Sequence, residues 1–333
     1  MVGPRWIFLR QAFLSSLTTP IMTSPDISIV IPTYNRQQLL AEAVNSVLSQ
    51  ECGNLEFELI VVDNNSSDHT KEIVQSLASK TPDRLRYLLE ARQGVSHARN
   101  LGIASARAPV IAFLDDDVRA ASGWIKTIQR AFLENPKVGF IGGKVIAEFT
   151  EDLPPWLTRD HWAPLALLDH GDCPITIVSP NGVGLITANC AVRRSVFERA
   201  GCFRPELQRI GDGVGSMEDH ELFERFLASG IEGLYRPDLI VSTEIPAARL
   251  TKAYHRHWHF RHGGFYALYQ SNEFERTSHG RLFGVPAHLY RQAAVDGFSY
   301  VKHSLLGKRD QAFTDEIRLR FFGGFFSRRI RSF

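Results

Sequence analysis

Three consecutive carboxylates, Asp115, Asp116 and Asp117, follow the apolar run 110–114. Like charges this close are costly to keep ionised together, and a bound divalent cation relieves their repulsion. Hard oxygen ligands select Mg²⁺ or Mn²⁺, which in turn neutralise the phosphates of a substrate. The alternative is a solvated acidic turn. The position after a strand favours the metal site, because ligands of open parallel sheets bind at the carboxyl ends of strands.

Glu218 and Asp219 form a second acidic feature, directly before apolar residues that recur at helical spacing up to Leu227. Carboxylates in the first turn of a helix are favoured by the helix dipole, which also keeps them ionised. Such a pair either only caps its helix or supplies a carboxylate that accepts a proton in catalysis.

The residues between 27 and 114 alternate between short apolar runs and helical patterns. Strands are expected at 27–31, 57–62, 85–89 and 110–114, with single helices between them. This alternation is typical of crossover units. We therefore predict an α/β fold with a mostly parallel, Rossmann-like sheet that is covered by helices on both faces.

The pattern changes after about residue 149. Residues 151–183 lack a clean period and are predicted to be a long loop or lid, which within a compact domain is more often functional than not. We expect helices at 193–200 and 219–229, and one or two strands within 231–241. From residue 247 onward only helices are expected, with breaks near 280–286 and 323–324.

The composition is that of a globular protein of roughly two domains. The formal net charge of +2 excludes nucleic-acid binding driven by bulk charge. Four cysteines without CxxC spacing indicate reduced thiols and a cytoplasmic location. No apolar stretch reaches the roughly 18 residues of a spanning helix. Residues 1–24 are predicted to be a disordered leader, with Met22 as an alternative start.

Several segments together resemble family 2 glycosyltransferases of the GT-A fold, in the order in which that family carries them. They are 30–36 (VIPTYNR), 61–66 (VVDNNS), 94–102, the acidic cluster 115–117, 189–194, 201–203 and 218–219. The resemblance implies transfer of a sugar from a nucleotide-diphosphate sugar to an acceptor hydroxyl with inversion, in polysaccharide or glycolipid and cell-envelope glycan synthesis. It also implies a GT-A domain over 25–246, with a donor half 25–150 and an acceptor half 151–246, and a C-terminal helical region 247–333.

The donor nucleotide is expected to contact the ends of the first two strands. Pro32, Thr33 and Tyr34 would face the nucleotide, and Arg36 either reaches a phosphate or is a plain surface charge. Asp63 and Asn64 would pair with the edge of the base, although the family often has a second Asp where this chain has Asn64. For Arg99, a phosphate contact and an ion pair with a carboxylate at the sheet end are both open.

The resemblance further assigns the acidic residues one by one. Asp117 would hold Mg²⁺ or Mn²⁺, Asp116 would contact the ribose or the surroundings of the metal, and Asp115 would support the base. Asp219 would be the general base, with Glu218 beside it. Many relatives carry a histidine near 241–246 that helps to hold the metal or diphosphate, whereas this chain has Thr243.

Four histidines lie close together further along the chain, at 255, 257, 259 and 262. His257 is our candidate for a further metal or diphosphate ligand, with His255 and His262 as alternatives, and a basic face toward diphosphate or membrane is equally open. A separate zinc site is disfavoured because cysteine and carboxylate companions are missing.

The stretch 318–333 contains five arginines and five phenylalanines and no acid. Basic charge beside aromatic bulk suits an anionic membrane surface, where the C-terminal helices would receive a lipid-linked acceptor on the cytoplasmic face. Alternatively, the phenylalanines pack on the catalytic domain and the arginines are solvated.

Two other functions remain as alternatives. A nucleotidyltransferase would need a glycine-rich basic signature after the first strand, which 32–36 does not provide. A non-catalytic nucleotide-sugar-binding module is disfavoured by the intact Asp117 and Asp219.

Overall fold

The computed structural model describes residues 24–149, 153–180, 183–209, 213–269 and 280–331. The predicted leader therefore lies outside the described residues except for Ser24. Parts of the predicted loop 151–183 and the last phenylalanine, Phe333, also lie outside them. No helix within the described ranges is both long and apolar enough to cross a membrane.

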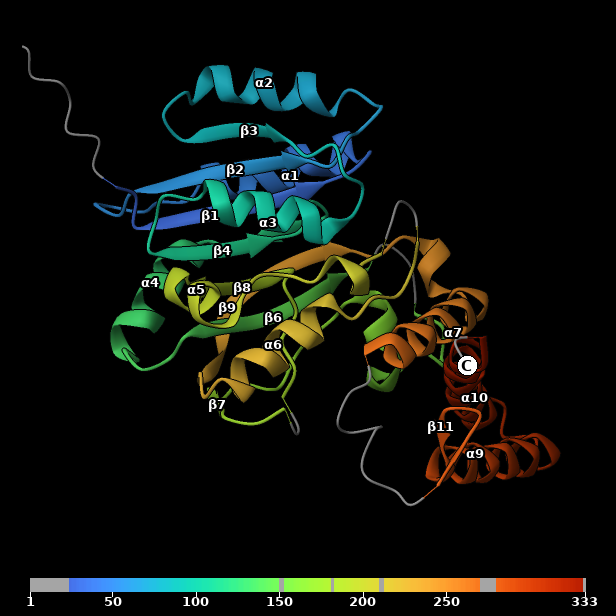
Figure 1. Ribbon diagram of the computed structural model, residues 1–333. Helices are drawn as coiled ribbons and strands as arrows, with labels where there is room; N and C mark the ends of the chain where they lie inside the picture. Colours follow the sequence, from blue (N-terminus) through green and yellow to red (C-terminus); the bar gives the residue numbers. More distant parts are fainter. Residues whose placement is uncertain (1–23, 150–152, 181–182, 210–212, 270–279, 332–333) are drawn as a thin grey trace, which may run out of the picture.

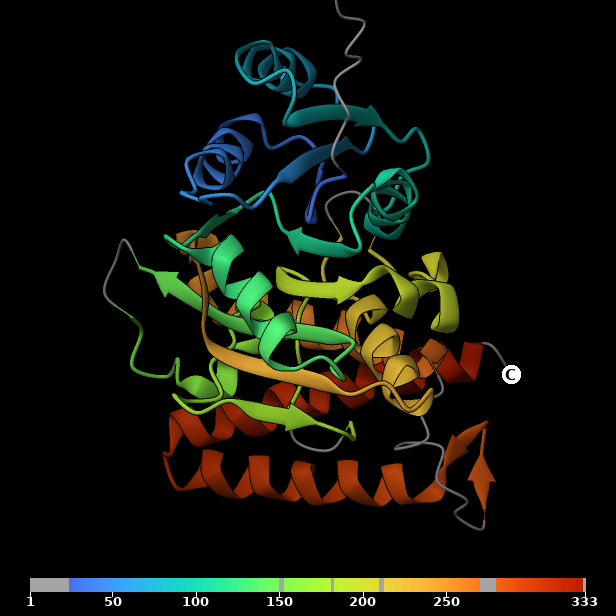
Figure 2. The same ribbon diagram turned by 90° about the vertical axis from the view of Figure 1, so that its left-hand side faces the viewer.

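The first half of the chain forms the predicted parallel sheet. Strands β1 (Ile27–Thr33), β2 (Phe57–Asp63), β3 (Leu85–Leu89) and β4 (Val110–Leu114) pair in the order β3-β2-β1-β4. Helices α1 (Gln37–Leu48), α2 (Thr70–Lys80) and α3 (Val95–Ser105) connect them. Every residue of β1 and β2 is buried, as near-continuous apolar runs require when both faces of a sheet are covered. Figure 2 shows α1 (blue) and α3 (teal) on opposite faces.

A mixed half continues the same sheet beyond β4. Strand β8 (Asn189–Arg193) runs antiparallel to β4, and β6 (Phe140–Glu148), β9 (Gly233–Glu244) and β5 (Val118–Ala120) follow, with β7 (Ile175–Ile177) also paired to β9. The region 231–241 thus forms one strand that extends to Glu244, and β6 and β8 were not predicted. Helices α4 (Trp124–Glu134), α5 (Arg194–Ala200) and α6 (Glu218–Ala228) pack around this half, the last two near their predicted positions.

Between β6 and β8 the described residues are mostly irregular, as predicted. They contain two short 3₁₀ turns, η1 (Arg159–His161) and η2 (Ala163–Leu165), and the three-residue strand β7. A further 3₁₀ turn, η3 (Pro205–Leu207), precedes α6, and η4 (Ala247–Leu250) follows β9.

The C-terminal region forms a helical cap, which we define as α7 (Lys252–Tyr269), α9 (Ala287–Leu305), α10 (Arg309–Arg331) and the hairpin of β10 (Arg281–Leu282) and β11 (Val285–Pro286). The cap has its own small apolar core of Ala267, Val285, Leu289, Phe322 and Phe325. The hairpin occupies the break expected near 280–286, so the prediction of helices alone was wrong at this point.

The second predicted break, at Gly323 and Gly324, was also wrong, because α10 continues through both residues. A Cβ atom on Gly324 would lie 1.8 Å from the carbonyl oxygen of Phe260 on α7. A Cβ atom on Gly263 of α7 would lie 2.0 Å from the carbonyl oxygen of Phe321 on α10. These two glycines therefore allow the helix backbones to cross in contact, and they do not end the helix.

The phenylalanines of α10 contribute to this packing. Phe322 and Phe325 are buried in the core of the cap, and Phe321 and Phe326 pack against it. These four phenylalanines therefore pack inside the protein, which is the alternative to a membrane-facing role. They pack on the cap, however, and not on the catalytic domain as that alternative expected. They do not form the exposed aromatic face expected of a membrane surface.

Candidate active site

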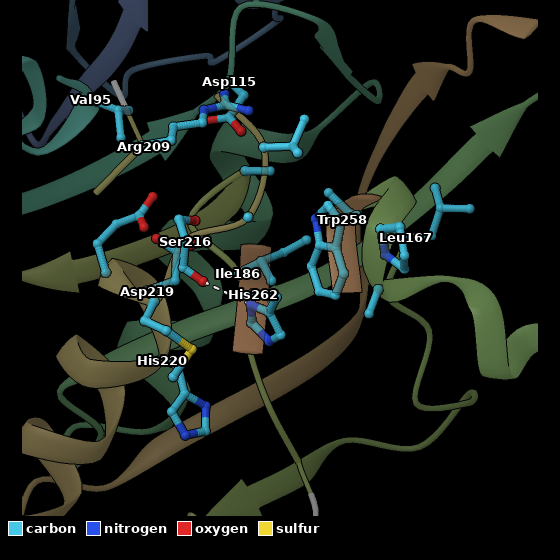
Figure 3. Close-up of a pocket in the computed structure, with 18 of the residues that line it drawn as sticks. Val95, Asp115, Leu167, Ile186, Arg209, Ser216, Asp219, His220, Trp258 and His262 are labelled. Carbon is cyan, nitrogen blue, oxygen red and sulfur yellow. Dashed lines mark hydrogen bonds between the residues drawn. The ribbon is translucent and has the colours of Figure 1, made fainter. Parts of the chain in front are cut away.

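A cavity of about 760 Å³ lies where the carboxyl ends of β1 and β4 meet the start of α6 and one side of α7. Ten of the predicted site residues line it: Pro32, Thr33, Tyr34, Arg36, Asn64, Arg99, Asp115, Asp116, Glu218 and Asp219. Figure 3 shows Asp115 and Asp219 on one side of the cavity and Trp258 on the other. Asp63, Asp117 and His257 are not among the lining residues.

We call one side of the cavity the acidic wall and define it as Asp115, Asp116, Glu218 and Asp219 with the cations Arg36 and Arg99. Arg36 lies 2.9 Å from Asp116 and 2.5 Å from Asp117, so it is not a plain surface charge. Burial raises the pKa of the Asp116 carboxyl to about 6. Burial opposes the charge of Asp117 as well, but Arg36, Arg249 and Arg209 outweigh it and lower the pKa of that carboxyl.

Arg99 is the hub of the acidic wall. It is only 3% exposed, and its guanidinium lies 3.0 Å from Asp115 and 3.3 Å from both Glu218 and Asp219. The ion pair that the sequence left open is thus present, with Asp115 at the end of β4 and with two carboxylates at the start of α6, and a phosphate contact of Arg99 stays a prediction. Burial and the neighbouring Asp219 raise the pKa of the Glu218 carboxyl.

The Asp219 carboxylate is held from two directions. The hydroxyl of Thr187 donates to Oδ1 at 2.7 Å, and the Thr187 backbone N–H donates to Oδ2 at 3.0 Å. Arg99 contacts Oδ1 from the other side. Thr187 was not predicted from the sequence. The one feature that could have pointed to it is its position two residues before the segment 189–194, which carries part of the family resemblance.

Asp63 and Asn64 both have structural partners. Asp63 is buried and accepts hydrogen bonds from the hydroxyl of Tyr87 at 2.7 Å and the backbone N–H of Ser66 at 2.8 Å. The Asn64 amide donates to the backbone carbonyls of Glu90 and Arg92, and its oxygen accepts from the N–H of Gly94. Asn64 lines the cavity and also fixes the 90–94 loop beside it.

The opposite side, which we call the aromatic wall, consists of Trp162, Tyr254, Trp258, His262 and Tyr266. The rings of Trp258 and His262 stack with centroids 4.2 Å apart. His262 Nδ1 donates to the carbonyl oxygen of Ser216 at 3.2 Å (Figure 3). Burial lowers the pKa of His262 to about 3, so the ring is neutral at neutral pH.

The structure separates the four clustered histidines. His257 is exposed on α7 and does not line the cavity, so its predicted place beside the metal or diphosphate is not the one the structure gives it. His255 is buried where α7 packs against the irregular segment after β6, in contact with Trp156 and His161. His262 is the member that lines the cavity. In a helix, residues five apart point in different directions, and only the neighbouring elements decide which faces a site.

The described residues contain no group of three His, Cys, Asp or Glu side chains arranged to hold a metal. Mg²⁺ commonly binds through one or two carboxylates together with substrate phosphates and water. Asp117 sits beside the cavity, 20% exposed, with Arg36 and Arg249 as its charge partners. Its carboxylate, and that of Asp115 two residues before it, are hard oxygen donors of the kind that Mg²⁺ or Mn²⁺ requires, so the residue types fit such an ion.

Comparisons with known proteins point to one family. The family model described as glycosyl transferase family 2 matches residues 28–201. The GalNAc(5)-diNAcBac-PP-undecaprenol beta-1,3-glucosyltransferase of Campylobacter jejuni is 41% identical over 108 residues, 32% of this chain and 34% of that protein. The glucosyl-dolichyl phosphate glucuronosyltransferase of Haloferax volcanii is 27% identical over 188 residues, 56% of this chain and 58% of that protein. The matches thus span less than two thirds of either relative.

A solved mannosyltransferase from Pyrobaculum calidifontis, in complex with GDP-Man and Mn²⁺, is similar in structure with a TM-score of 0.59. The similarity covers 90% of this chain and 86% of that chain at 18% identity. It confirms the predicted GT-A fold.

Proposed function

The chain belongs to glycosyl transferase family 2 and is a glycosyltransferase, and from this premise we propose that it passes a sugar from a nucleotide-diphosphate sugar to a hydroxyl of a lipid-linked acceptor, with inversion. The observation that carries the proposal is the meeting of Asp115 and Asp116 with Asp219 in one cavity, although more than 100 residues separate them along the chain. A donor bound at the strand ends would lie within reach of the carboxylate at the start of α6.

Donor binding is assigned to the ends of β1 and β4. Pro32, Thr33 and Tyr34 line the cavity, and Arg36 adds a guanidinium suited to a phosphate. Asp117 would hold Mg²⁺ or Mn²⁺. Such an ion, when bound, would neutralise the diphosphate and stabilise the charge that develops on the leaving nucleotide. Arg36 would then exchange part of its contact with Asp117 for a phosphate oxygen.

Asp219 is assigned as the general base. Thr187 and Arg99 hold its carboxylate in one orientation, which is what a group that accepts a proton from an incoming hydroxyl needs. The acceptor oxygen would form the new bond to the anomeric carbon while the bond from that carbon to the phosphate oxygen breaks. The acceptor proton goes to Asp219, and the electron pair of the broken bond leaves with the nucleoside diphosphate.

The acceptor is assigned to the aromatic wall. Flat rings such as Trp258 offer apolar surface to the C–H faces of a sugar, and neutral His262 adds no charge there. The names of the two relatives contain undecaprenol and dolichyl phosphate, which supports a lipid-linked glycan of the cell envelope as the acceptor class. A location on the cytoplasmic side of a membrane stays a prediction.

Calorimetry with a panel of nucleotide sugars, with and without Mn²⁺, tests the donor and the metal together. Asp117→Asn should abolish the Mn²⁺-dependent part of donor binding, whereas Asp172→Asn, at an exposed position, should leave it unchanged. Unchanged Mn²⁺-dependent binding in Asp117→Asn would contradict the metal assignment. Product analysis separates the alternatives, since a transferase releases a nucleoside diphosphate, a nucleotidyltransferase releases pyrophosphate, and a binding module releases neither.

A further inference from the structure

Helix α9 carries a row of large apolar side chains in water. Phe298 is 74% exposed and Leu305 is 83% exposed, and Val295 and Val301 are each about half exposed. Figures 1 and 2 place α9 at the outer edge of the molecule, with α10 between it and the sheet. Isolated apolar residues on a surface are ordinary, but a contiguous patch marks an interaction site.

Three of these side chains share one side of the helix. With about 100° between successive residues, Val295, Phe298 and Leu305 fall within one arc together with Arg291 and Lys302. We call these five residues the outer face of α9. The opposite side holds the buried Leu289 and Asp296, so the outer face points away from the core of the cap.

The charge on this helix is one-sided. Arg291 is exposed at one end of the apolar row and Lys302 within it, and the single carboxylate between residues 287 and 305 is the buried Asp296. The next charged residues along the chain are Lys308, Arg309 and Asp310, all exposed. A surface of apolar bulk interleaved with cations matches the boundary between anionic lipid headgroups and acyl chains.

We propose that the outer face of α9 docks on an anionic lipid bilayer, with Phe298 and Leu305 inserted among the headgroups and Arg291 and Lys302 on lipid phosphates. A second copy of the chain fits less well. Two outer faces packed together would bury these cations against one another with no acid on the face to pair with them. The proposal rests on the exposure and charge of α9 and goes beyond the proposed sugar transfer, which it does not require.

Co-sedimentation of the full chain with vesicles tests this surface. The protein should pellet with phosphatidylcholine vesicles that contain phosphatidylglycerol, less with phosphatidylcholine alone, and less at high salt because screening weakens the contribution of the cations. The double variant Phe298→Ser, Leu305→Ser should bind about tenfold more weakly, since it removes the two largest inserted side chains. Arg291→Gln with Lys302→Gln should remove most of the difference between the two vesicle types.

Leu133→Ser is the matched control, because Leu133 is 73% exposed on α4, far from the cap in Figure 1. It should pellet as the wild type does. Hydrolysis of the donor in the absence of vesicles should be unchanged in all variants, which separates a failure of docking from a failure of catalysis or folding. Equal pelleting of the wild type and the Phe298/Leu305 variant would overturn the proposal. So would absence of wild-type binding, or a dimer in light scattering that this variant dissociates.

Discussion

The two walls of the cavity handle charge in opposite ways. On the acidic wall, carboxylates are kept beside guanidinium groups: Asp116 with Arg36, and Asp115, Glu218 and Asp219 with Arg99. On the aromatic wall, burial keeps His262 neutral by lowering its pKa to about 3. We therefore expect the acidic wall to bind and react through charge, and the aromatic wall to bind through shape and ring faces. Substitutions on the two walls should therefore change different properties of the protein.

The walls also differ in what holds them in place. The acidic wall rests on the ends of buried parallel strands and on the start of α6. The aromatic wall is mostly carried by α7, whose position depends on its packing against α10. Substitutions that disturb the packing of the cap should thus weaken acceptor binding and leave donor binding unchanged.

The largest expected effect is on the reaction at the acidic wall. Asp219→Asn should lower kcat by about 10² to 10⁴-fold, the usual contribution of a positioned general base, and leave the Kd of the donor within a few fold. The amide keeps the shape that Thr187 and Arg99 hold, so a loss of turnover would report the missing base. Asp83→Asn, in the exposed turn before β3, is the control. If Glu218→Gln abolished turnover and Asp219→Asn did not, the two roles would be exchanged.

The second largest effect is expected on stability, from the loss of Arg99 in the acidic wall. Arg99→Met should lower the free energy of unfolding by about 3–5 kcal/mol, because it leaves three carboxylates beside one another at a buried site. The loss should shrink as the pH is lowered, because Glu218, whose pKa burial and Asp219 already raise, takes up a proton and the repulsion weakens. Arg92→Met is the matched control: Arg92 pairs with Glu90 at 2.8 Å, but its side chain is mostly in water. Equal Tm values for the two variants would show that the hub adds no stability.

The same contrast explains what could be predicted from the sequence. The parallel strands are continuous apolar runs, so their own sequence predicts them. The carboxylates of the site directly follow a strand or begin a helix, so the residues beside them predict where they lie in the fold. The partner of Arg99 was left open because Asp115, Glu218 and Asp219 reach it only through the tertiary fold. Strands β6 and β8 were missed because the order of the sheet, and not their local sequence, decides their pairing.

The cap was the hardest part to predict. Two consecutive glycines such as Gly323 and Gly324 are typical of a helix break. Only the close approach of α7 shows that Gly324 is needed inside a continuous helix. In the same way, the spacing of the histidines does not tell which one faces the cavity, because α7 contacts the site, the cap core and water at once. Local sequence thus predicted the position of a site residue where that residue lies at a strand end. It left the position ambiguous where the packing of helices decides it.

A smaller effect tests the support of the aromatic wall. Gly324→Ala should lower the free energy of unfolding by about 1–3 kcal/mol, because the added Cβ meets the Phe260 carbonyl and forces α7 and α10 apart. Gly323→Ala is the matched control: its Cβ would have its nearest neighbours at 3.8 Å, and alanine should stabilise the helix by up to about 1 kcal/mol. The Kd of the donor should be unchanged in both. A Gly324→Ala protein as stable as the Gly323→Ala protein would show that the close crossing is dispensable.

The smallest effect is the response of the aromatic wall to pH. His262 stays neutral in the folded protein down to about pH 3, whereas the unfolded chain takes up this proton near its ordinary pKa of 6.5. Between these values the unfolded state binds more protons, so the free energy of unfolding falls as the pH is lowered. Urea unfolding at pH 7.5 and 5.5 should give a difference that is about 1 kcal/mol smaller in His262→Gln than in the wild type. His257→Gln, exposed on the same helix, should keep the wild-type difference. The neighbouring His259 and His220 are unchanged in both variants, so a His262→Gln protein with the full wild-type difference would mean that His262 is not the buried neutral group of this wall.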